Sequence, residues 1–229
     1  MSRLEAPEPR PLSELGAVRE ILKLPFHWRG LRRNPTGSGT VLVVPGFMTG
    51  DGATWFLRRS LERLGYTVHG WGLGRNGGDV PNLLPAVTER VRILSEREPI
   101  HLVGWSLGGY LSREVARDLP DRVHQVITLA SPVVGGPKYT AAARFYRERL
   151  GVDLDALEQE IAARDEVPLR VPVTALYSPS DAIVCPAACL DRVNPQVEHV
   201  PIDCPHAGFG FSPEVLSIVA KRLARPTRT

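Results

Sequence analysis

Residues 99–118 constrain the fold more than any other stretch, because they join a strand pattern to a helix pattern through a sharp turn. Apolar residues before the turn predict a buried strand, and those after it recur every three to four residues, which predicts a helix. Between them, residues 104–108 read Gly-Trp-Ser-Leu-Gly, so that Ser106 stands at the apex of a Gly-x-Ser-x-Gly sequence. We therefore expect its hydroxyl to be exposed above a sheet, with the helix N-terminus beneath it.

The two glycines of this turn have a steric role. A Cβ at Gly104 or Gly108 would collide with the neighbouring strand or helix, so glycine permits a strained backbone at the serine. The alternative is an ordinary tight turn in which serine was chosen for its small size. The interpretation of Ser106 as a nucleophile is favoured because the partners that such a serine needs follow it in the expected order.

Composition sets the broad class. The 229 residues are 43% apolar and 23% charged, which fits one globular domain with a sizeable core. A net charge of +3 is too small to indicate a nucleic-acid partner. No apolar run reaches the length of a membrane span, and the first residues lack the apolar segment of a secretion signal. We expect a cytoplasmic enzyme without stable membrane insertion, and nothing in the sequence indicates an oligomeric state.

The order of the predicted elements indicates the architecture. Residues 1–39 are expected to form a lead-in with one amphipathic helix, which either covers a flank of the domain or contacts a membrane or partner. Residues 40–229 are expected to form the main domain, with a small cap at 136–166 that contains two helix patterns, at 141–150 and 154–163. Strand patterns occur at 40–47, 67–71, 99–105, 123–130, 172–177 and 198–202, and helix patterns lie between them. Right-handed crossovers then give an α/β fold, a mainly parallel sheet of about six strands with helices on both faces.

Four candidate functional residues follow the carboxyl ends of predicted strands: Phe47, Ser106, Asp181 and His206. Ligands of open parallel sheets bind at that edge, so these residues are expected to converge there. A serine hydroxyl needs a base to become a nucleophile, and histidine has a suitable pKa. A carboxylate is needed in turn to orient the imidazole and to stabilise its charged form.

The chain order Ser106, Asp181, His206 satisfies this requirement. The other histidines lie within or at the start of strands, or before the core, whereas His206 lies in a loop after a strand. Asp203 is too near His206 to come from a separate strand end. Asp191 lies farther from a strand end, along the connection between the strands at 172–177 and 198–202. A merely structural loop histidine is the alternative at position 206.

An acyl-transfer intermediate carries an oxyanion, which requires two fixed donors. The backbone N–H of Leu107, at the helix start, and that of Phe47, just past Gly46, are the candidates. An apolar acyl pocket is expected from a set of side chains near the strand ends, each of which is equally compatible with core packing: Phe47, Met48, Trp105, Val133, Phe209 and Phe211.

The sequence resembles the α/β-hydrolase family from about residue 40 to 224, and within it the compact bacterial lipases and esterases. The resemblance is carried by the Gly-Trp-Ser-Leu-Gly-Gly turn at 104–109, the Val-Val-Pro-Gly-Phe loop at 43–47, Ser180-Asp181 and Pro205-His206. Two departures are present. Pro45-Gly46 replaces the usual His-Gly but keeps the backbone donor, and residues 1–39 show no counterpart of the two opening strands.

The resemblance implies a serine hydrolase that cleaves small esters with an apolar acyl group through an acyl-enzyme, without a cofactor. An aspartyl nucleophile is excluded by the serine at 106. An acyltransferase or thioesterase would use the same triad, and a non-catalytic binding protein would use the same fold.

Two further features carry alternatives. Cys185, Cys189 and Cys204 are odd in number, so free buried thiols are favoured over a bridge or a zinc set that includes His206. The glycine-rich stretch 72–78 lacks the spacing of a phosphate-binding loop and is expected to be a surface loop near the strand ends.

Overall fold

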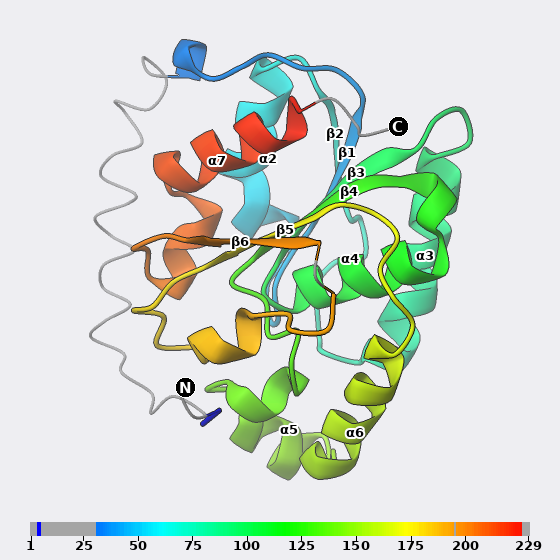
Figure 1. The fold of residues 1–229 in the computed structure, drawn as a ribbon, viewed down its shortest axis with the longest axis vertical. Coiled ribbons are helices and arrows are strands. Elements are labelled where there is room, and N and C mark those ends of the chain that lie inside the picture. The colour runs from blue at the N-terminus through cyan, green and yellow to red at the C-terminus, as the bar shows by residue number, and fades with distance from the viewer. Residues whose placement is uncertain (1–3, 6–30, 195, 226–229) are drawn as a thin grey trace.

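A computed structural model describes residues 4–5, 31–194 and 196–225. Within these residues six strands form one parallel sheet in the order β2-β1-β3-β4-β5-β6 (Figure 1). The strands are β1 (Thr40–Val44), β2 (Thr67–Gly70), β3 (Ile100–Trp105), β4 (Val123–Leu129), β5 (Val173–Tyr177) and β6 (Val197–Pro201). The predicted α/β class and parallel sheet are confirmed.

The α-helices of the described residues are α2 (Trp55–Arg63), α3 (Val80–Leu94), α4 (Leu107–Asp118), α5 (Ala143–Arg149), α6 (Leu154–Asp165) and α7 (Pro213–Leu223). Short 3₁₀ helices are η2 (Leu31–Arg33), η3 (Asp51–Thr54), η4 (Pro120–Arg122), η5 (Gly136–Tyr139), η6 (Pro186–Cys189) and η7 (His206–Gly210). The amphipathic helix expected before residue 31 lies outside the described residues. Among the described helices, none has the length and apolar character that a membrane span requires.

Two apolar layers hold the sheet between its helices, with α2 and α7 on one face and α3 and α4 on the other (Figure 1). Side chains alternate along a strand. Val43 and Val103 therefore pack with α2 and α7, whereas Leu42 and Leu102 pack with α3 and α4. Strands buried on both faces explain the continuous apolar runs in the sequence.

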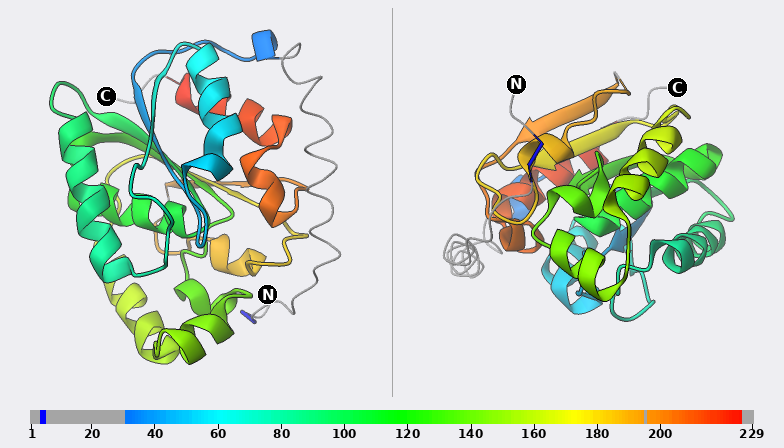
Figure 2. Two further views of the ribbon diagram at one scale, coloured as in Figure 1. Left: turned by 180° about the vertical axis from the view of Figure 1, so that it is seen from behind. Right: turned by 90° about the horizontal axis from the view of Figure 1, so that it is seen from below.

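The segment 136–166, which we call the cap segment, contains η5, α5 and α6 and connects β4 to β5. The two helices form the lower end of the molecule in Figure 1 and are nearest the viewer in the view from below (Figure 2). Backbone hydrogen bonds join this segment to the loop after β5. Ala141 N–H donates to the Ile183 carbonyl at 2.8 Å, and Cys185 N–H donates to the Tyr139 carbonyl at 3.0 Å.

The strand order determines where a crevice forms at the carboxyl edge of the sheet. β1 pairs with β2 on one side and with β3 on the other, so the chain order reverses between β1 and β3. The loops that leave these two strands diverge, which creates the crevice where ligands of such sheets bind. In this order β2 and β6 are the two edge strands, and no strand precedes β1 within the described residues.

Candidate active site

Ser106 occupies the turn between β3 and α4 in a strained conformation. Its φ of 53° and ψ of −121° are unusual for a residue with a side chain, and such strain costs about 1–3 kcal/mol. Its N–H donates to the Leu129 carbonyl at 2.8 Å, and its own carbonyl accepts from Gly109 N–H at 2.9 Å. The surrounding structure therefore holds the serine at the carboxyl end of the sheet.

Close packing explains the glycines around Ser106. A Cβ on Gly104 would lie 2.3 Å from the Gly108 carbonyl oxygen, and one on Gly108 would lie 2.2 Å from that of Val44. A Cβ on Gly109 would lie 1.9 Å from Ser131 Oγ. The steric role predicted for the first two glycines is confirmed, and the third allows α4 to approach the segment after β4.

Asp181 and His206 are in direct contact. Nδ1 of the imidazole lies 2.8 Å from one carboxylate oxygen, Oδ2, and both side chains are buried. The other oxygen, Oδ1, accepts the N–H groups of Ile183 and Val184, each at 2.8 Å. Because these two bonds fix the carboxylate, Oδ2 is directed at the imidazole. The ring therefore contacts Asp181 through Nδ1 and not through Nε2.

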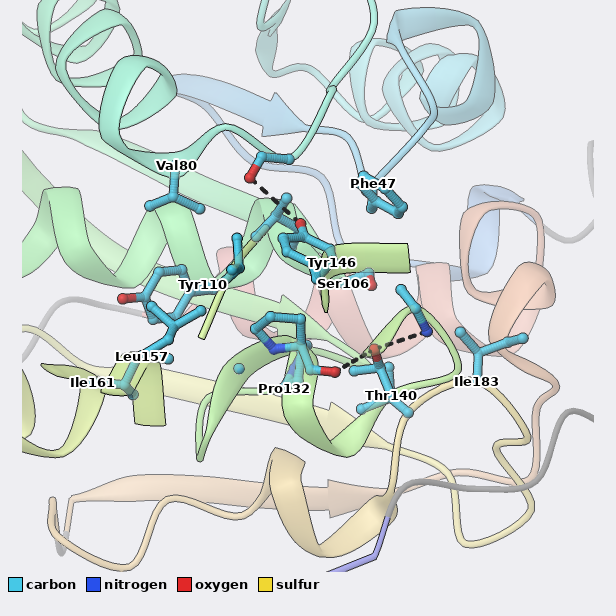
Figure 3. Close-up of a pocket in the computed structure, with 18 of the residues that line it drawn as sticks. Phe47, Val80, Ser106, Tyr110, Pro132, Thr140, Tyr146, Leu157, Ile161 and Ile183 are labelled. Atoms are coloured by element: carbon cyan, nitrogen blue, oxygen red, sulfur yellow. Dashed lines mark hydrogen bonds between the residues drawn. The ribbon is translucent and has the colours of Figure 1, made fainter. Parts of the chain in front are cut away.

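Ser106 and His206 line the same pocket, although they come from different strand ends. Trp105, the residue before the serine, has its ring centroid 5.9 Å from that of the histidine. Phe47 and Tyr146 line the pocket together with Ser106 (Figure 3). The fold thus brings together the serine, the histidine and, behind the histidine, the aspartate.

The loop after β1 approaches the serine from the other side of the crevice. A Cβ on Gly46 would lie 3.2 Å from Ser106 Cβ, which shows how closely the backbone passes. Phe47 and Leu107 both line the pocket. No hydrogen bond within the described residues uses either of their N–H groups, and Leu107 N–H belongs to the first turn of α4, where such donors are open.

The pocket has a volume of about 560 Å³ and lies between the carboxyl edge of the sheet and the cap segment. Apolar side chains form most of its wall, with Tyr110, Leu157 and Ile161 at one end and Ile183 near the other (Figure 3). Phe47 and Trp105 belong to this wall, as expected. Tyr146 of α5 also contributes: its ring packs 5.2 Å from that of Phe47, centroid to centroid.

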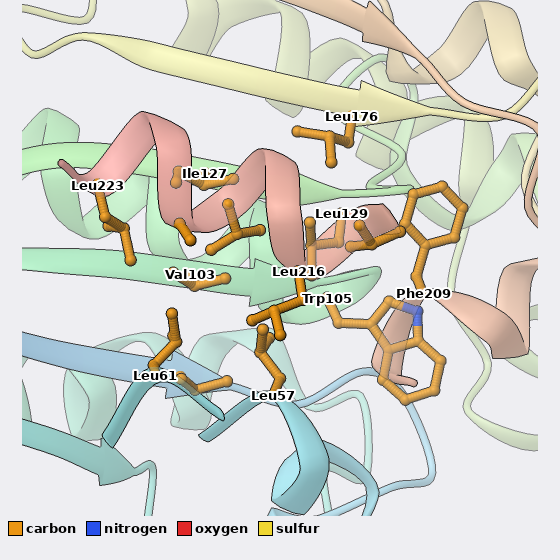
Figure 4. Packing of buried hydrophobic residues seen from close by; sticks show 14 of the residues in the cluster. Leu57, Leu61, Val103, Trp105, Ile127, Leu129, Leu176, Phe209, Leu216 and Leu223 are labelled. Carbon is orange, nitrogen blue, oxygen red and sulfur yellow. The ribbon is translucent and has the colours of Figure 1, made fainter. Parts of the chain in front are cut away.

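Four of the expected pocket residues lie elsewhere. Met48 has a φ of 60°, is 40% exposed and does not line the pocket. Val133 is buried but does not line the pocket. Phe209 is turned by η7 into the core beside Trp105 and Leu216 (Figure 4), and Phe211 packs at the margin of that core. For Phe209 the core-packing alternative is therefore correct.

The competing acidic residues have other partners. Asp191 Oδ2 pairs with Arg113 Nη1 at 2.8 Å, and Asp203 accepts a hydrogen bond from Ser180 Oγ at 2.8 Å. His199 Nε2 accepts the N–H of Asp191 at 3.0 Å. The structure thus leaves Asp181 as the carboxylate that contacts His206.

Most pocket residues that the sequence did not indicate come from the cap segment and from α3. They include Val80, Tyr146, Val152, Leu157 and Ile161. Helix periodicity showed that 141–150 and 154–163 would be helical, but it did not show which residues would face the sheet edge. The aromatic residues Phe145 and Tyr146 were the available signal, because an aromatic pair on a short helix needs a surface to cover it.

The three cysteines are free and buried, as the favoured alternative had it. Burial raises the pKa of the Cys189 thiol well above its ordinary value, with nearby Asp181 and Cys185 adding to the shift. Within the described residues no group of three or more His, Cys, Asp or Glu side chains is arranged to hold a metal ion. The cysteines therefore behave as small apolar core residues.

A parallel sheet with this serine turn and a buried acid–histidine contact defines the class of protein. The sequence model of the alpha/beta hydrolase fold matches residues 39–177, which is more than half of the 229-residue chain. The chain belongs to the α/β-hydrolase family.

A curated relative, the pimeloyl-[acyl-carrier protein] methyl ester esterase of Aeromonas hydrophila, is 35% identical over 100 residues, covering 42% of this chain and 39% of the relative. The chain thus matches about two-fifths of that protein's length. Among solved structures, that of the metagenome-derived lipolytic enzymes LipS and LipT is similar with a TM-score of 0.61 at 18% identity, covering 82% of this chain and 93% of that one. A monoacylglycerol lipase from Paleococcus ferrophilus gives 0.60 at 17%, covering 82% and 96%. These two likenesses show the shared fold.

Proposed function

We propose that this chain is a serine hydrolase that cleaves carboxylic esters with an apolar acyl group. The observation that carries the proposal is the 2.8 Å contact of Asp181 with His206 in the pocket where Ser106 stands on its strained turn. A nucleophile, a base and an orienting carboxylate from three strand ends are the parts that acyl transfer requires.

In the proposed mechanism Ser106 Oγ attacks the ester carbonyl while His206 Nε2 takes the hydroxyl proton. Asp181 keeps the proton on Nδ1 and stabilises the imidazolium that forms. The backbone N–H groups of Phe47 and Leu107 stabilise the oxyanion, and His206 returns its proton to the departing alcohol. His206 next takes a proton from water, whose oxygen attacks the acyl carbonyl. The bond from that carbon to Ser106 Oγ then breaks, the proton passes from His206 to Oγ and the carboxylic acid leaves, so the cycle needs no cofactor.

The apolar wall of the pocket supports an apolar acyl group as substrate. Each buried methylene contributes about 0.8 kcal/mol, which corresponds to up to about fourfold in kcat/KM until the cavity is filled. The A. hydrophila relative is named for a pimeloyl methyl ester, so dimethyl pimelate belongs in the substrate panel. The three free cysteines fit a reducing compartment such as the cytoplasm.

The test is hydrolysis of p-nitrophenyl esters from acetate to palmitate by wild type and Ser106→Ala. We expect wild type to prefer longer chains than acetate and Ser106→Ala to lose about 10³-fold or more in kcat. Ser95→Ala, which changes a buried serine at the end of α3, is the matched control and should keep wild-type rates. Hydrolysis at equal rates by wild type and Ser106→Ala would contradict the role of Ser106. No hydrolysis above background by wild type would favour a binding protein on this fold, and faster transfer to an added alcohol than to water would favour an acyltransferase.

A further inference from the structure

Asn76 is the one fully buried side chain of the glycine-rich loop at 72–78. The preceding loop residues, from Gly72 to Arg75, are exposed. Its Nδ2 donates to the Pro45 carbonyl at 2.9 Å, and its Oδ1 accepts the Gly78 N–H at 3.2 Å. Its backbone is paired as well: the N–H donates to the Thr49 carbonyl at 2.8 Å, and the carbonyl accepts the Met48 N–H at 2.7 Å. Three of these four bonds reach the loop after β1.

The positions of the bonds along that loop are informative. Pro45 O belongs to the peptide unit just before the one that carries the Phe47 N–H, and Met48 N belongs to the unit just after it. Asn76 therefore holds the backbone on both sides of one N–H group, and that group itself makes no hydrogen bond within the described residues. A donor that is fixed at both flanks and left open is preorganised for a ligand oxygen.

The loop would not keep this shape unaided. Met48 has a φ of 60°, which is unfavourable for a residue with a side chain. Its carbonyl accepts a hydrogen bond from Arg75 Nε at 3.1 Å. Arg75 and Asn76 therefore both bond to the strained residue Met48. The two loops are also packed closely, because a Cβ on Gly50 would lie 2.8 Å from the Gly74 carbonyl oxygen.

We propose that Asn76 is a positioning residue for the reaction, one that sets the direction of the Phe47 N–H toward the oxyanion. The inference rests on the proposed ester hydrolysis and adds a residue that contacts neither substrate nor reacting atoms. The proposal also assigns a role to the glycine-rich stretch 72–78. Its glycines let the chain turn tightly enough to bury Asn76 against the loop after β1.

The test measures kcat and KM separately in Asn76→Ala. Loss of one oxyanion donor costs 10²- to 10³-fold in kcat, so we expect a decrease of about 100-fold with KM within about twofold of wild type. Affinity for an alkylboronic acid, whose tetrahedral adduct places an oxygen where the oxyanion forms, should fall by a similar factor. The pH profile of kcat/KM should keep its shape, because Asp181 and His206 are unchanged.

Asn194→Ala is the matched control for lost stability. Asn194 is also buried, and its side chain also makes one donated and one accepted hydrogen bond, to Asp191 Oδ2 and from Leu169 N–H. It precedes β6, at the opposite end of the sheet from the pocket. We expect Asn194→Ala to lower Tm without changing kcat. If both variants lower kcat alike, or if Asn76→Ala keeps wild-type kcat and boronate affinity, Asn76 has only a structural role.

Two further variants keep the test decisive if Asn76→Ala does not fold. Asn76→Asp keeps the side-chain shape and the acceptor for Gly78 N–H but removes the donor to Pro45, so it should lose at least as much kcat. Arg75→Ala changes an exposed residue and should lower kcat threefold or more, because Met48 O loses a partner. Unchanged kcat in Arg75→Ala would overturn the proposal if no Asn76 variant folds. An inactive wild type would instead contradict the ester hydrolysis itself.

Discussion

Gly108 lies where α4 passes closest to the loop after β1. A Cβ here would be 2.2 Å from the Val44 carbonyl oxygen and 2.6 Å from that of Pro45, and neither backbone atom can move without shifting the strand end. The absent side chain therefore sets the distance between the serine turn and the loop that carries Phe47. A single residue thus couples the two sides of the crevice.

Gly108→Ala should consequently be more harmful than a usual glycine-to-alanine change in a helix. Alanine has the higher helix propensity by about 1 kcal/mol, yet we expect a lower Tm and a loss of the proposed esterase activity, because overpacking costs typically 1–3 kcal/mol. Gly77→Ala is the control, since a Cβ there meets no atom within 4 Å. Thermal unfolding of both variants checks this, and an equally stable, active Gly108→Ala would contradict the packing described above.

At the scale of elements, α4 is tied to the cap segment by buried charges. Arg164 Nε of α6 donates to Glu114 Oε2 at 2.8 Å, and Arg117 Nη2 lies 2.6 Å from Asp165 Oδ1. Arg113 and Arg117 are almost fully buried, so their charges depend on these carboxylates. The helix that begins at the serine therefore also anchors α6 over the pocket.

Removing one carboxylate from this cluster should destabilise the protein strongly. Glu114→Ala leaves a buried arginine with fewer partners, which typically costs about 3–5 kcal/mol. The control is Glu148→Ala, which breaks an exposed pair with Arg144 and should change the free energy of unfolding by about 0.5 kcal/mol or less. Urea denaturation of the two variants gives the comparison, and equal midpoints would show that the buried cluster does not hold α6.

The elements could be predicted well because their patterns are local. The apolar runs at 40–47 and 99–105 correspond to β1 and β3, and the helix patterns at 141–150 and 154–163 correspond to α5 and α6. The expected strand at 40–47 ends earlier, at Val44, because Pro45 cannot donate to a ladder and the chain turns there. Hydrophobic periodicity reports burial along one element, so it leaves open which neighbour an element meets.

The site shows the same division between local and non-local information. Asp181 and His206 could be predicted to meet because both follow strand ends of one parallel sheet, and their contact is confirmed. Phe209 could not be separated from a pocket residue, since an aromatic side chain near the histidine satisfies either environment. Asn76 was not predicted because its role depends on four hydrogen bonds. Three of them reach residues about 30 positions earlier in the chain, and the fourth reaches Gly78.

For the whole molecule, the two ends of the sheet differ in character. The carboxyl end holds the pocket, and near the other end His101 is buried between Tyr66 and His124, with ring centroids 6.3 and 5.2 Å away. Burial, followed by the charge of His124, lowers the pKa of His101 to about 4. Its Nδ1 has no hydrogen-bond partner within the described residues, which fits an uncharged ring.

This pKa predicts acid sensitivity of a definite sign. Below pH 6.5 the unfolded chain binds a proton at His101 that the folded protein excludes, so stability is complete above pH 6.5 and falls as the pH approaches 4. The total effect is about 3 kcal/mol, at no more than about 1.4 kcal/mol per pH unit. Urea unfolding of wild type and His101→Gln between pH 4 and 7 measures it. The variant should show the shallower dependence, and identical slopes would contradict the assignment.

The proposed function requires Ser106 to be the nucleophile and His206 to be its base. The most direct measurement is mass-spectrometric mapping of the protein after reaction with a fluorophosphonate, in wild type and in His206→Ala. We predict one phosphonyl group on the peptide that contains Ser106, at full occupancy in wild type and strongly reduced without the histidine. A label on any other residue, or ester hydrolysis that continues with no label on Ser106, would contradict the claim.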